Sequence, residues 1–500
     1  MSEASYGTYQ SPLASRNASA RMLALWSPRH KFNTWRRIWL AVAEAQHEMG
    51  LPVTAEQLAE LRAVVTKPGG ITDDEMRLAE RYERELRHDV MAHVHALGDA
   101  CPKARGIIHL GMTSQDVVCN ADAIILDGAI DLISTKVARL VISLSEQAGP
   151  HKALPTLGFT HYQPAQPVTV GRRCAGWAYE THLAGQALFD AWHRSAFRGF
   201  KGATGTQASF LALFQGRNES VDRFEALALH KLYGCDCTGM THRLTGQTYP
   251  RVTDATLLSA LAGIASVLHK VATDIRLLSN RKEIDEPFES KQIGSSAMPY
   301  KRNPMRCERV CGLTRFVMNL VGNAYDTAAT QWLERTLDDS SNRRLSLPEA
   351  FLALDGALDL MHNVASGLIV HPAMVRKNLM AELPFMATEN LLMACVTLGA
   401  DRQEYHEAIR VHAQAAGLRV KQEGLENDLL ERLRSDRRFW AKSRGGALSA
   451  ELDWDNLLDP MKYVGRSVEQ TECFLREVVD PLREKHKDAL AKLDDSGPRV

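Results

Sequence analysis

The chain has 500 residues, of which 45% are hydrophobic and 24% are charged. This balance is typical of a folded globular protein and excludes wholesale disorder. The 60 basic and 60 acidic residues leave no net charge. The absence of net positive charge excludes a protein that binds nucleic acid or an anionic membrane through the electrostatic field of its net charge. The length predicts two or three domains, or one long and elongated domain.

The first residues, MSEASYGTYQSPLASRN, contain no apolar core, so they do not have the pattern of a secretory signal. No run approaches the roughly eighteen apolar residues of a membrane span. The nine cysteines are scattered, and Cys235 and Cys237 do not have zinc-finger spacing. We therefore expect a cytoplasmic protein with reduced, buried thiols.

Three regions follow one another along the chain. Residues 1–112 have the pattern of mixed helices, residues 113–369 contain long helices interrupted by polar loops, and residues 370–500 contain shorter, charged helices. Two stripes in the central region repeat in alternating steps of four and three, which is the seam of a left-handed bundle. Helices of roughly 30 residues, about 45 Å long, bury such stripes only against equally long partners. We expect an all-α, elongated bundle shared between subunits. The stripes are Leu126, Ile130, Ile133, Val137, Leu140 and Leu144, and Leu257, Leu261, Ile264, Leu268, Val271, Ile275 and Leu278.

The first polar stretch whose residues are capable of catalysis or ligand binding is RHDVMAH, residues 87–93. A second, GMTSQD, follows at residues 111–116. A metal site on a helix favours imidazoles at positions i and i+4, but His88 and His93 are five residues apart. This spacing argues against a metal site. A substrate-binding or structural role is favoured for His88, which stands beside Arg87 and Asp89.

Two further stretches leave alternatives open. In TLGFTHYQPAQ, residues 156–166, His161 lies near a break in the helical pattern and is compatible with either a structural or an acid–base role. In ERTLDDSSNRR, residues 334–344, three arginines flank two aspartates. This second stretch fits either a solvated, capped helix start or an anion clamp, because guanidinium groups bind carboxylates and phosphates with paired hydrogen bonds.

The loop GSSAMPYKRNPM, residues 294–305, combines turn formers with hydroxyls and cations. It lacks the spacing of a phosphate-binding P-loop, and Met298 stands where an SxxK motif requires lysine. What remains is a mobile loop in which a lysine can activate a serine or stabilise a developing oxyanion. We expect Arg302 and Arg306 to make structural or intersubunit ion pairs.

GSSAMPYKRNP closely resembles GSSxMPxKxN, the signature loop of the fumarase/aspartase superfamily. RHDVMAHVH, TLGFTHYQPAQ, ERTLDDSSNRR and ELPFMATEN extend the resemblance, from about residue 10 to about residue 480, to the animal-type branch of the adenylosuccinate lyase family. The resemblance implies an all-α, three-domain fold whose central bundle forms the helical core of a homotetramer, with each site assembled from three subunits. It implies β-elimination of fumarate from adenylosuccinate, giving AMP, and from SAICAR, giving AICAR, without a cofactor.

The resemblance also implies roles for individual residues. Ser295 matches the general base, Lys301 its electrostatic support, and His161 the general acid that protonates the departing nitrogen. Glu308 matches the carboxylate that orients this histidine, and His88 a second histidine near the phosphate. Asn17 stands where the family leads us to expect an aromatic residue. The implied substrate-binding residues are Arg16, Asn17, Arg87, His88, Asp89, Thr113, Ser114, Thr160, Gln247, Ser296, Asn303, Arg309, Arg335, Ser340 and Arg344.

Two other hypotheses are compatible with a chain of this kind. One is a superfamily lyase that releases fumarate from a different succinyl-amine substrate, which would need other phosphate contacts. The other is a non-catalytic helical assembly that has kept the fold, which would be favoured by loss of Ser295, His161 or Lys301. All three residues are present.

Overall fold

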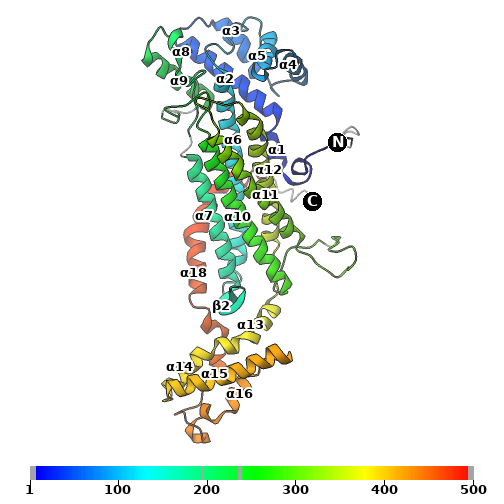
Figure 1. Cartoon of the computed structure of the whole chain (residues 1–500), viewed down its shortest axis with the longest axis vertical. Coiled ribbons are helices and arrows are strands. Elements are labelled where there is room, and N and C mark those ends of the chain that lie inside the picture. Colours follow the sequence, from blue (N-terminus) through cyan, green and yellow to red (C-terminus); the bar gives the residue numbers. More distant parts are fainter. Residues whose placement is uncertain (1–6, 194–195, 235–238, 290, 494–500) are drawn as a thin grey trace.

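The computed structural model describes residues 7–193, 196–234, 239–289 and 291–493. The molecule is a long rod of helices with a smaller group of helices at each end (Figure 1). Five long helices form the rod: α6 (Ser114–Ala148), α7 (Val170–His193), α10 (Val252–Asn280), α11 (Met305–Ala329) and α12 (Asp338–Ser366).

Both apolar stripes predicted from the sequence are buried along the rod. Every residue of the stripe from Leu126 to Leu144 lies in α6, and every residue of the stripe from Leu257 to Leu278 lies in α10. They belong to one hydrophobic core with α7, α11 and α12. The prediction of an all-α long-helix bundle is therefore confirmed.

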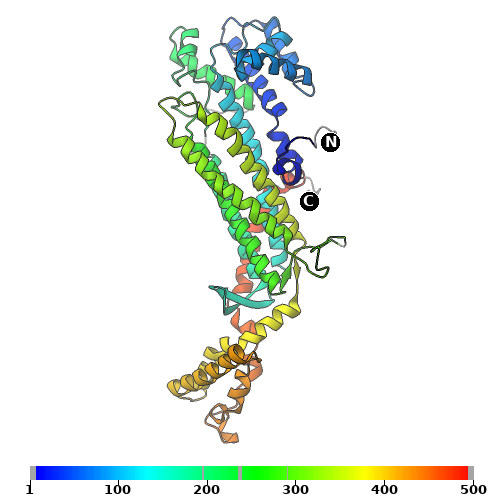
Figure 2. The same ribbon diagram turned by 45° about the vertical axis from the view of Figure 1, so that its right-hand side comes forward.

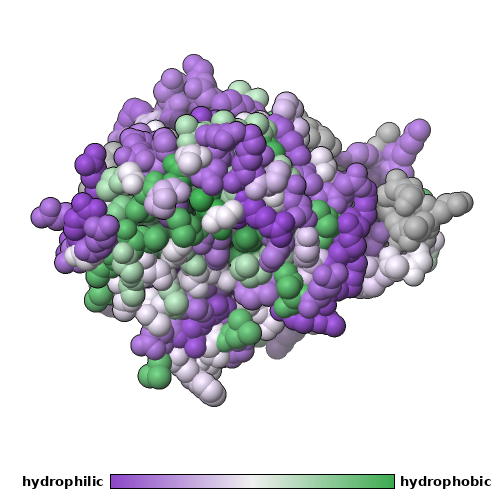
Figure 3. Space-filling view, turned by 90° about the horizontal axis from the view of Figure 1, so that it is seen from above, coloured by the Kyte–Doolittle hydropathy of each residue, from purple (hydrophilic) through white to green (hydrophobic). Residues whose placement is uncertain are grey.

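The N-terminal end of the rod is covered by short helices. These are a π-helical turn η2 (Leu13–Asn17), α1 (Ala20–Leu25), α2 (Pro28–Glu48), α3 (Ala55–Val65), α4 (Asp73–Leu86) and α5 (Asp89–Ala100). Of these, α2, α3 and α5 share a second core with α8 (Ala208–Leu213) and α9 (Asn218–Tyr233), whereas Leu13 of η2 and Met22 of α1 pack on the core of the rod. Seen end-on, this face is largely hydrophilic, with apolar side chains exposed in its middle (Figure 3).

The opposite end is built by α13 (Pro372–Met386), α14 (Thr388–Thr397), α15 (Arg402–Leu418), α16 (Leu429–Ser435) and α17 (Trp454–Leu457), around a third core. Single helical turns connect them: η3 (Arg419–Glu423), η4 (Arg437–Phe439), η5 (Lys442–Arg444) and η6 (Pro460–Tyr463). The chain then returns to the rod through α18 (Ser467–Phe474), η7 (Leu475–Val479) and α19 (Asp480–Leu490), which pack on α7 and α6.

The division into domains at residues 112 and 369 stays a prediction, but packing crosses it in two places. Residues 200–232 share the core of the N-terminal helices, although the sequence assigns them to the central region. Phe474, Leu475 and Val479 pack on the rod, although the sequence assigns them to the C-terminal region. The reason is that α9 and η7 each bury apolar side chains against a segment distant in the chain.

The structure contains two small antiparallel pairs of strands where the sequence predicts only helices and loops. β1 (Pro155–Thr160) pairs with β2 (Gln163–Thr169), and β3 (Ile284–Asp285) pairs with β4 (Ile369–Val370). The sequence of β2 contains two prolines, which are tolerated here because a two-stranded pair consists only of edges. β2 lacks the alternation of apolar residues by which strands are recognised.

One helix, α10, is long and apolar enough to cross a membrane by length and composition, contrary to our expectation that no segment would be. The bent pair α13 and α14 passes the same test only if it is taken as one span. Half of the apolar window of α10 is buried inside the protein. Core helices of soluble proteins pass this test as well, and the seam residues of α10 pack within the rod.

Seven described cysteines are free, and six of them are buried. Burial raises the pKa of the Cys174 and Cys395 thiols to about 12, which keeps them protonated. The expectation of reduced, buried thiols is met at these six positions. Cys235 and Cys237 lie outside the described residues.

Two histidines are enclosed in the N-terminal core. His93 of α5 stacks on Phe32, with ring centres 3.7 Å apart, and His109 accepts a hydrogen bond from the Trp39 indole at 3.1 Å. Burial lowers the pKa of both imidazoles to about 4. Both are therefore neutral in the folded protein at neutral pH.

We expect acid to destabilise this N-terminal core before it affects the rod. Below pH about 6.5 the unfolded chain protonates both histidines, whereas the folded chain does so only near pH 4. Stability is therefore lost as pH falls through this window, by up to about 1.4 kcal/mol per pH unit for each histidine. Melting temperatures measured from pH 7 to 5 should fall less steeply for His93→Phe, which keeps the ring stacking. Equal slopes for the variant and the unmodified protein would contradict this account.

Candidate active site

The first group of predicted residues surrounds the junction of α4 and α5. Arg87 ends α4 in the left-handed region, with φ of 53°, and His88 caps the N-terminus of α5. An arginine in this conformation is strained by about 1–2 kcal/mol, and such strain concentrates at functional sites. The junction holds the side chains of Arg87, His88 and Asp89 at the end of the rod where α6 begins.

Helix α6 and helix α12 bring two further predicted residues to this junction. The His88 Nδ1 accepts the backbone N–H of Met91 at 3.3 Å, so the proton of the neutral ring lies on Nε2, which is 3.4 Å from the Ser114 hydroxyl. The Arg344 guanidinium donates to the Asp89 carboxylate at 2.6 Å. Burial would raise the pKa of Asp89, but Arg344 and the backbone N–H of Val90 lower it. Thr113 precedes Ser114, and its backbone N–H donates to Asp116 at 2.7 Å.

Arg335 is the centre of a second group, beside the first. Its guanidinium donates to Gln247 Oε1 at 2.9 Å and to Ser340 Oγ at 2.9 Å. The Gln115 amide, with its oxygen turned toward Arg335, accepts from the same guanidinium at 2.9 and 3.2 Å. Two predicted residues, Gln247 and Ser340, thus each lie within hydrogen-bond distance of Arg335, although Gln247 and Arg335 are 88 residues apart in the chain.

Buried ion pairs hold this second group in place. The Asp339 carboxylate, fully buried, accepts from Arg251 at 2.6 Å and from Arg335 at 3.3 Å. Arg343 pairs with Asp254 at 2.7 Å and with Asp122 at 3.0 Å. Burial alone would raise the pKa of Asp254, but Arg343 and Arg251 together lower it. Because buried pairs keep a fixed geometry, the start of α12 presents Arg335, Ser340 and Arg344 in defined positions.

His161 lies on the hairpin between β1 and β2, at the other end of the rod (Figures 1 and 2). Thr160 pairs with Gln163, so His161 and Tyr162 form a two-residue turn, and both have positive φ, 53° and 56°. Such turns favour Asn-Gly, so a His-Tyr pair is strained here. The turn presents both side chains to solvent. His161 is thus an exposed histidine at a strained turn, which favours a functional role over a structural one.

The signature loop projects from the side of the rod between β3 and α11 (Figure 2). The Ser295 hydroxyl accepts the backbone N–H groups of Met298 at 3.1 Å and Ala297 at 3.4 Å. The Asn303 amide donates to the Gly294 carbonyl at 2.9 Å, which closes the loop at its base. A Cβ at position 294 would meet the Lys301 carbonyl oxygen at 2.1 Å, so only glycine fits. Ser296 and the Lys301 side chain are exposed.

Arg302 and Arg306 make structural contacts. Arg306 pairs with Glu289 and donates to the Pro287 carbonyl, and Arg302 lies 5.1 Å from the Phe288 ring centre. The expected ion pair is therefore confirmed for Arg306, whereas Arg302 makes a cation–π contact instead.

A third group of predicted residues lies where η2 meets the rod. Burial and the neighbouring Arg16 lower the pKa of Arg309 in α11, which places these two cations close together. The Asn17 side chain donates to the Pro12 carbonyl at 2.9 Å, and its backbone packs against Gly356 of α12. Glu308 lies 3.9 Å from Arg276 and is half-exposed.

Within one chain the proposed acid and base are not brought together. Among the described residues, no hydrogen bond or ion pair joins His161 to Ser295, Lys301 or Glu308. His161 lies on the hairpin, Ser295 on the projecting loop and Arg344 beside the N-terminal helices. A single chain therefore presents three partial sites.

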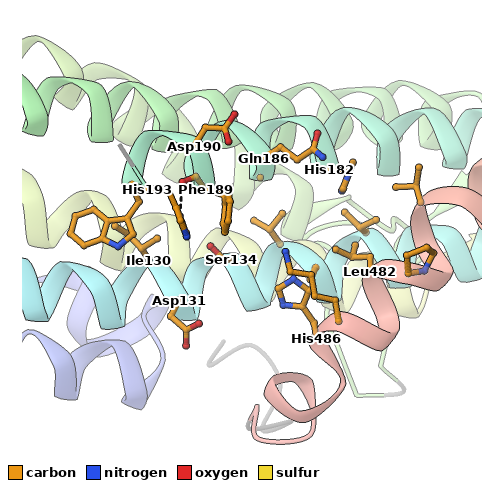
Figure 4. A pocket seen from close by; sticks show the side chains of 18 of the residues that line it. Ile130, Asp131, Ser134, His182, Gln186, Phe189, Asp190, His193, Leu482 and His486 are labelled. Carbon is orange, nitrogen blue, oxygen red and sulfur yellow. Dashed lines mark hydrogen bonds between the residues drawn. The ribbon is translucent and has the colours of Figure 1, made fainter. Parts of the chain in front are cut away.

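A cavity of about 900 Å³ lies between α6, α7 and α19 (Figure 4). It contains His182, His193 and His486 together with Asp131 and Asp190, but none of the predicted site residues lines it. Among the described residues, no group of three or more His, Cys, Asp or Glu side chains is placed to hold a metal ion.

Sequence reasoning missed two residues that contact or adjoin the predicted ones. Gln115 stands in GMTSQD, but nothing in that pattern indicates contact with Arg335. Lys31 of α2 lies within electrostatic reach of Asp89 and Arg344, and it stands in an ordinary amphipathic helix with no motif around it.

Comparisons with known proteins find family models and relatives that match most of the chain. The family model described as "Lyase" matches residues 17–319, and the one described as "Adenylosuccinate lyase C-terminus" matches residues 384–474. The chain is 49% identical to an adenylosuccinate lyase of Schizosaccharomyces pombe over 475 residues, which are 95% of each chain. It is 47% identical to an adenylosuccinate lyase of Saccharomyces cerevisiae over 494 residues, 98% of this chain and 99% of that one.

The chain belongs to the adenylosuccinate lyase family.

Its fold is shared more widely than this family. A 3-carboxy-cis,cis-muconate lactonizing enzyme from Pseudomonas putida superposes with a TM-score of 0.77 at 24% identity, covering 95% of this chain and all of that one. At this identity the likeness concerns the fold alone. The resemblance to the fumarase/aspartase superfamily and to adenylosuccinate lyases, seen first in GSSAMPYKRNP, is confirmed, and the chain is a lyase of this family.

Proposed function

We propose that this lyase catalyses the β-elimination of fumarate from adenylosuccinate, giving AMP, and from SAICAR, giving AICAR, in purine nucleotide synthesis. The observation that carries the proposal is the pair of backbone N–H groups directed at Ser295 Oγ within a loop of the family pattern. These donors stabilise negative charge on the oxygen, so they lower the cost of the alkoxide that a serine base requires.

The proposed reaction takes place in two proton transfers. The Ser295 alkoxide removes a proton from the carbon beside a carboxylate, and Lys301 stabilises the negative charge that spreads onto that carboxylate. The electron pair then forms the double bond of fumarate as the carbon–nitrogen bond breaks. His161 protonates the departing nitrogen, with Glu308 orienting its ring. No step requires a cofactor.

The substrate carries carboxylates and a phosphate, and the two groups around Arg344 and Arg335 offer the cations and donors to hold them. We assign His88 to the phosphate and leaving-group side. The other proposed contacts are Arg16, Asn17, Arg87, Asp89, Thr113, Ser114, Thr160, Gln247, Ser296, Asn303, Arg309, Arg335, Ser340 and Arg344.

We further propose a cytoplasmic homotetramer whose sites are shared between subunits. The separation of His161 from Ser295 within one chain supports this proposal, because both must reach the same substrate. Exposed apolar side chains along α7 and α11, namely Tyr179, Leu183, Phe316 and Tyr325, supply surface that a neighbouring subunit would cover.

The direct test is turnover of adenylosuccinate, followed by ultraviolet absorbance as AMP and fumarate form. We expect the purified protein to release equal amounts of both products without added metal or cofactor. Argininosuccinate serves as the control substrate and should not be cleaved. No product from either adenylosuccinate or SAICAR, with a correctly folded protein, would overturn the proposal.

A further inference from the structure

Lys31 is a lysine of α2 that is partly removed from water yet lacks an acidic partner. Its ammonium lies 4.9 Å from the ring centre of Trp35 and 5.3 Å from that of Phe32. Within the described part of the chain it makes no ion pair or hydrogen bond. The buried lysines Lys136 and Lys201, by contrast, each pair with a carboxylate.

The surroundings of Lys31 are those of the proposed substrate site. Phe32 stacks on His93 of α5, the helix that begins at Asp89. Asp89 and Arg344, which form an ion pair, both act on the Lys31 ammonium electrostatically. Lys31 therefore lies on the wall formed by α2, α5 and the start of α12.

The charges on this wall do not balance without a ligand. Lys31 and Arg344 face the carboxylates of Asp89 and Glu83, and the nearby Asp122 is already paired with Arg343 at 3.0 Å. Arg87 adds a further cation at the same junction. Burial and the neighbouring Arg344 lower the pKa of Lys31, and the carboxylates of Asp122, Asp89 and Glu83 offset only part of this effect, so the folded chain loses free energy by keeping Lys31 charged there. An anion at this position would relieve that loss.

We infer that Lys31 is a further substrate-binding residue, whose ammonium contacts an anionic group of the substrate, phosphate or carboxylate, beside Arg344. This inference rests on the proposed function. The competing explanation is that Lys31 only packs on Trp35 and Phe32, a cation–π contact that contributes stability but no binding.

Lys31→Met keeps most of the side-chain volume and removes the charge, and Lys31→Arg keeps the charge. For both variants we would measure kcat and KM for adenylosuccinate, and the inhibition constants of inorganic phosphate and of fumarate. Lys231→Met is the matched control, because Lys231 pairs with Glu48 of the same helix α2, remote from the site. Melting temperatures report whether the variants are folded.

We expect Lys31→Met to raise KM about tenfold or more with a smaller change in kcat, since one charge-assisted contact is lost. The inhibition constant of phosphate or of fumarate should rise by a similar factor, and the one that rises identifies the group bound. Lys31→Arg should recover most of the affinity, and Lys231→Met should behave as the unmodified protein.

Unchanged KM and inhibition constants in a folded Lys31→Met protein would overturn the inference, even if its melting temperature falls. Should Lys31→Met fail to fold, the rate at which Lys31 is acetylated in the unmodified protein tests the inference instead. Inorganic phosphate or fumarate should slow the acetylation of Lys31 and not that of Lys231, and equal rates with and without both anions would refute the contact. Absence of turnover in the unmodified protein would instead count against the proposed function.

Discussion

Ser295→Ala is expected to lower kcat by about 10²–10⁴-fold, the usual contribution of a general base, with a smaller change in KM. The hydroxyl oxygen that accepts the backbone N–H groups of Ala297 and Met298 would be absent, so the proposed base would be lost. The loop itself should persist, because the bond from Asn303 to the Gly294 carbonyl does not involve Ser295. Steady-state kinetics with adenylosuccinate measure the effect.

Tyr300→Phe is the matched control for this prediction. It also removes one hydroxyl from the same loop, but the Tyr300 side chain is exposed and its hydroxyl contacts only the Met298 sulfur, at 3.9 Å. Turnover by Tyr300→Phe should stay within about threefold of the unmodified protein, the range of a surface change. If Ser295→Ala retained near-normal kcat, Ser295 would not be the base, and another group would have to be sought on the loop.

Mixing two inactive variants, Ser295→Ala and His161→Ala, is expected to restore activity. If each site takes its serine and its histidine from different subunits, a mixed oligomer contains some sites in which both are native. For equal amounts and random assembly of subunits, about a quarter of the sites should be active. The experiment unfolds and refolds the two variants together and then measures turnover.

Each variant refolded alone provides the baseline for this experiment, since it contains no complete site. Mass spectrometry of differently tagged chains should show that mixed oligomers have formed. If mixed oligomers form and activity stays at the baseline, the serine and histidine of a site come from one chain. The sharing of sites between subunits would then be wrong, and His161 would need a large movement to reach Ser295.

The apolar stripes of α6 and α10 show what a local sequence pattern is able to predict. All thirteen stripe residues predicted from spacing alone are buried, because the side-chain period of a helix is fixed by its backbone geometry. The signature loop could be predicted from the sequence equally well, because its turn formers and hydroxyls stand within a few residues of one another. For the same reason, the sequence alone identifies the family.

The sequence did not predict the two strands of the hairpin that carries His161. β2 lacks alternation of apolar residues, and His161 and Tyr162 stand at the two positive-φ turn positions where Asn-Gly is the pair by which such hairpins are recognised. Its existence depends on packing against the neighbouring α13 and α7, which local sequence does not encode.

By itself the sequence determined the helical class, the long seams, the signature loop and the family, all of which depend on residues close together in the chain. Only the tertiary structure decided which polar groups meet: Arg335 with Gln247, Arg344 with Asp89, and Lys31 with neither a carboxylate nor a hydroxyl. The physical reason is that these contacts join residues far apart in the chain, whose approach is set by the packing of whole helices. The separation of His161 from Ser295 in one chain was decided in the same way.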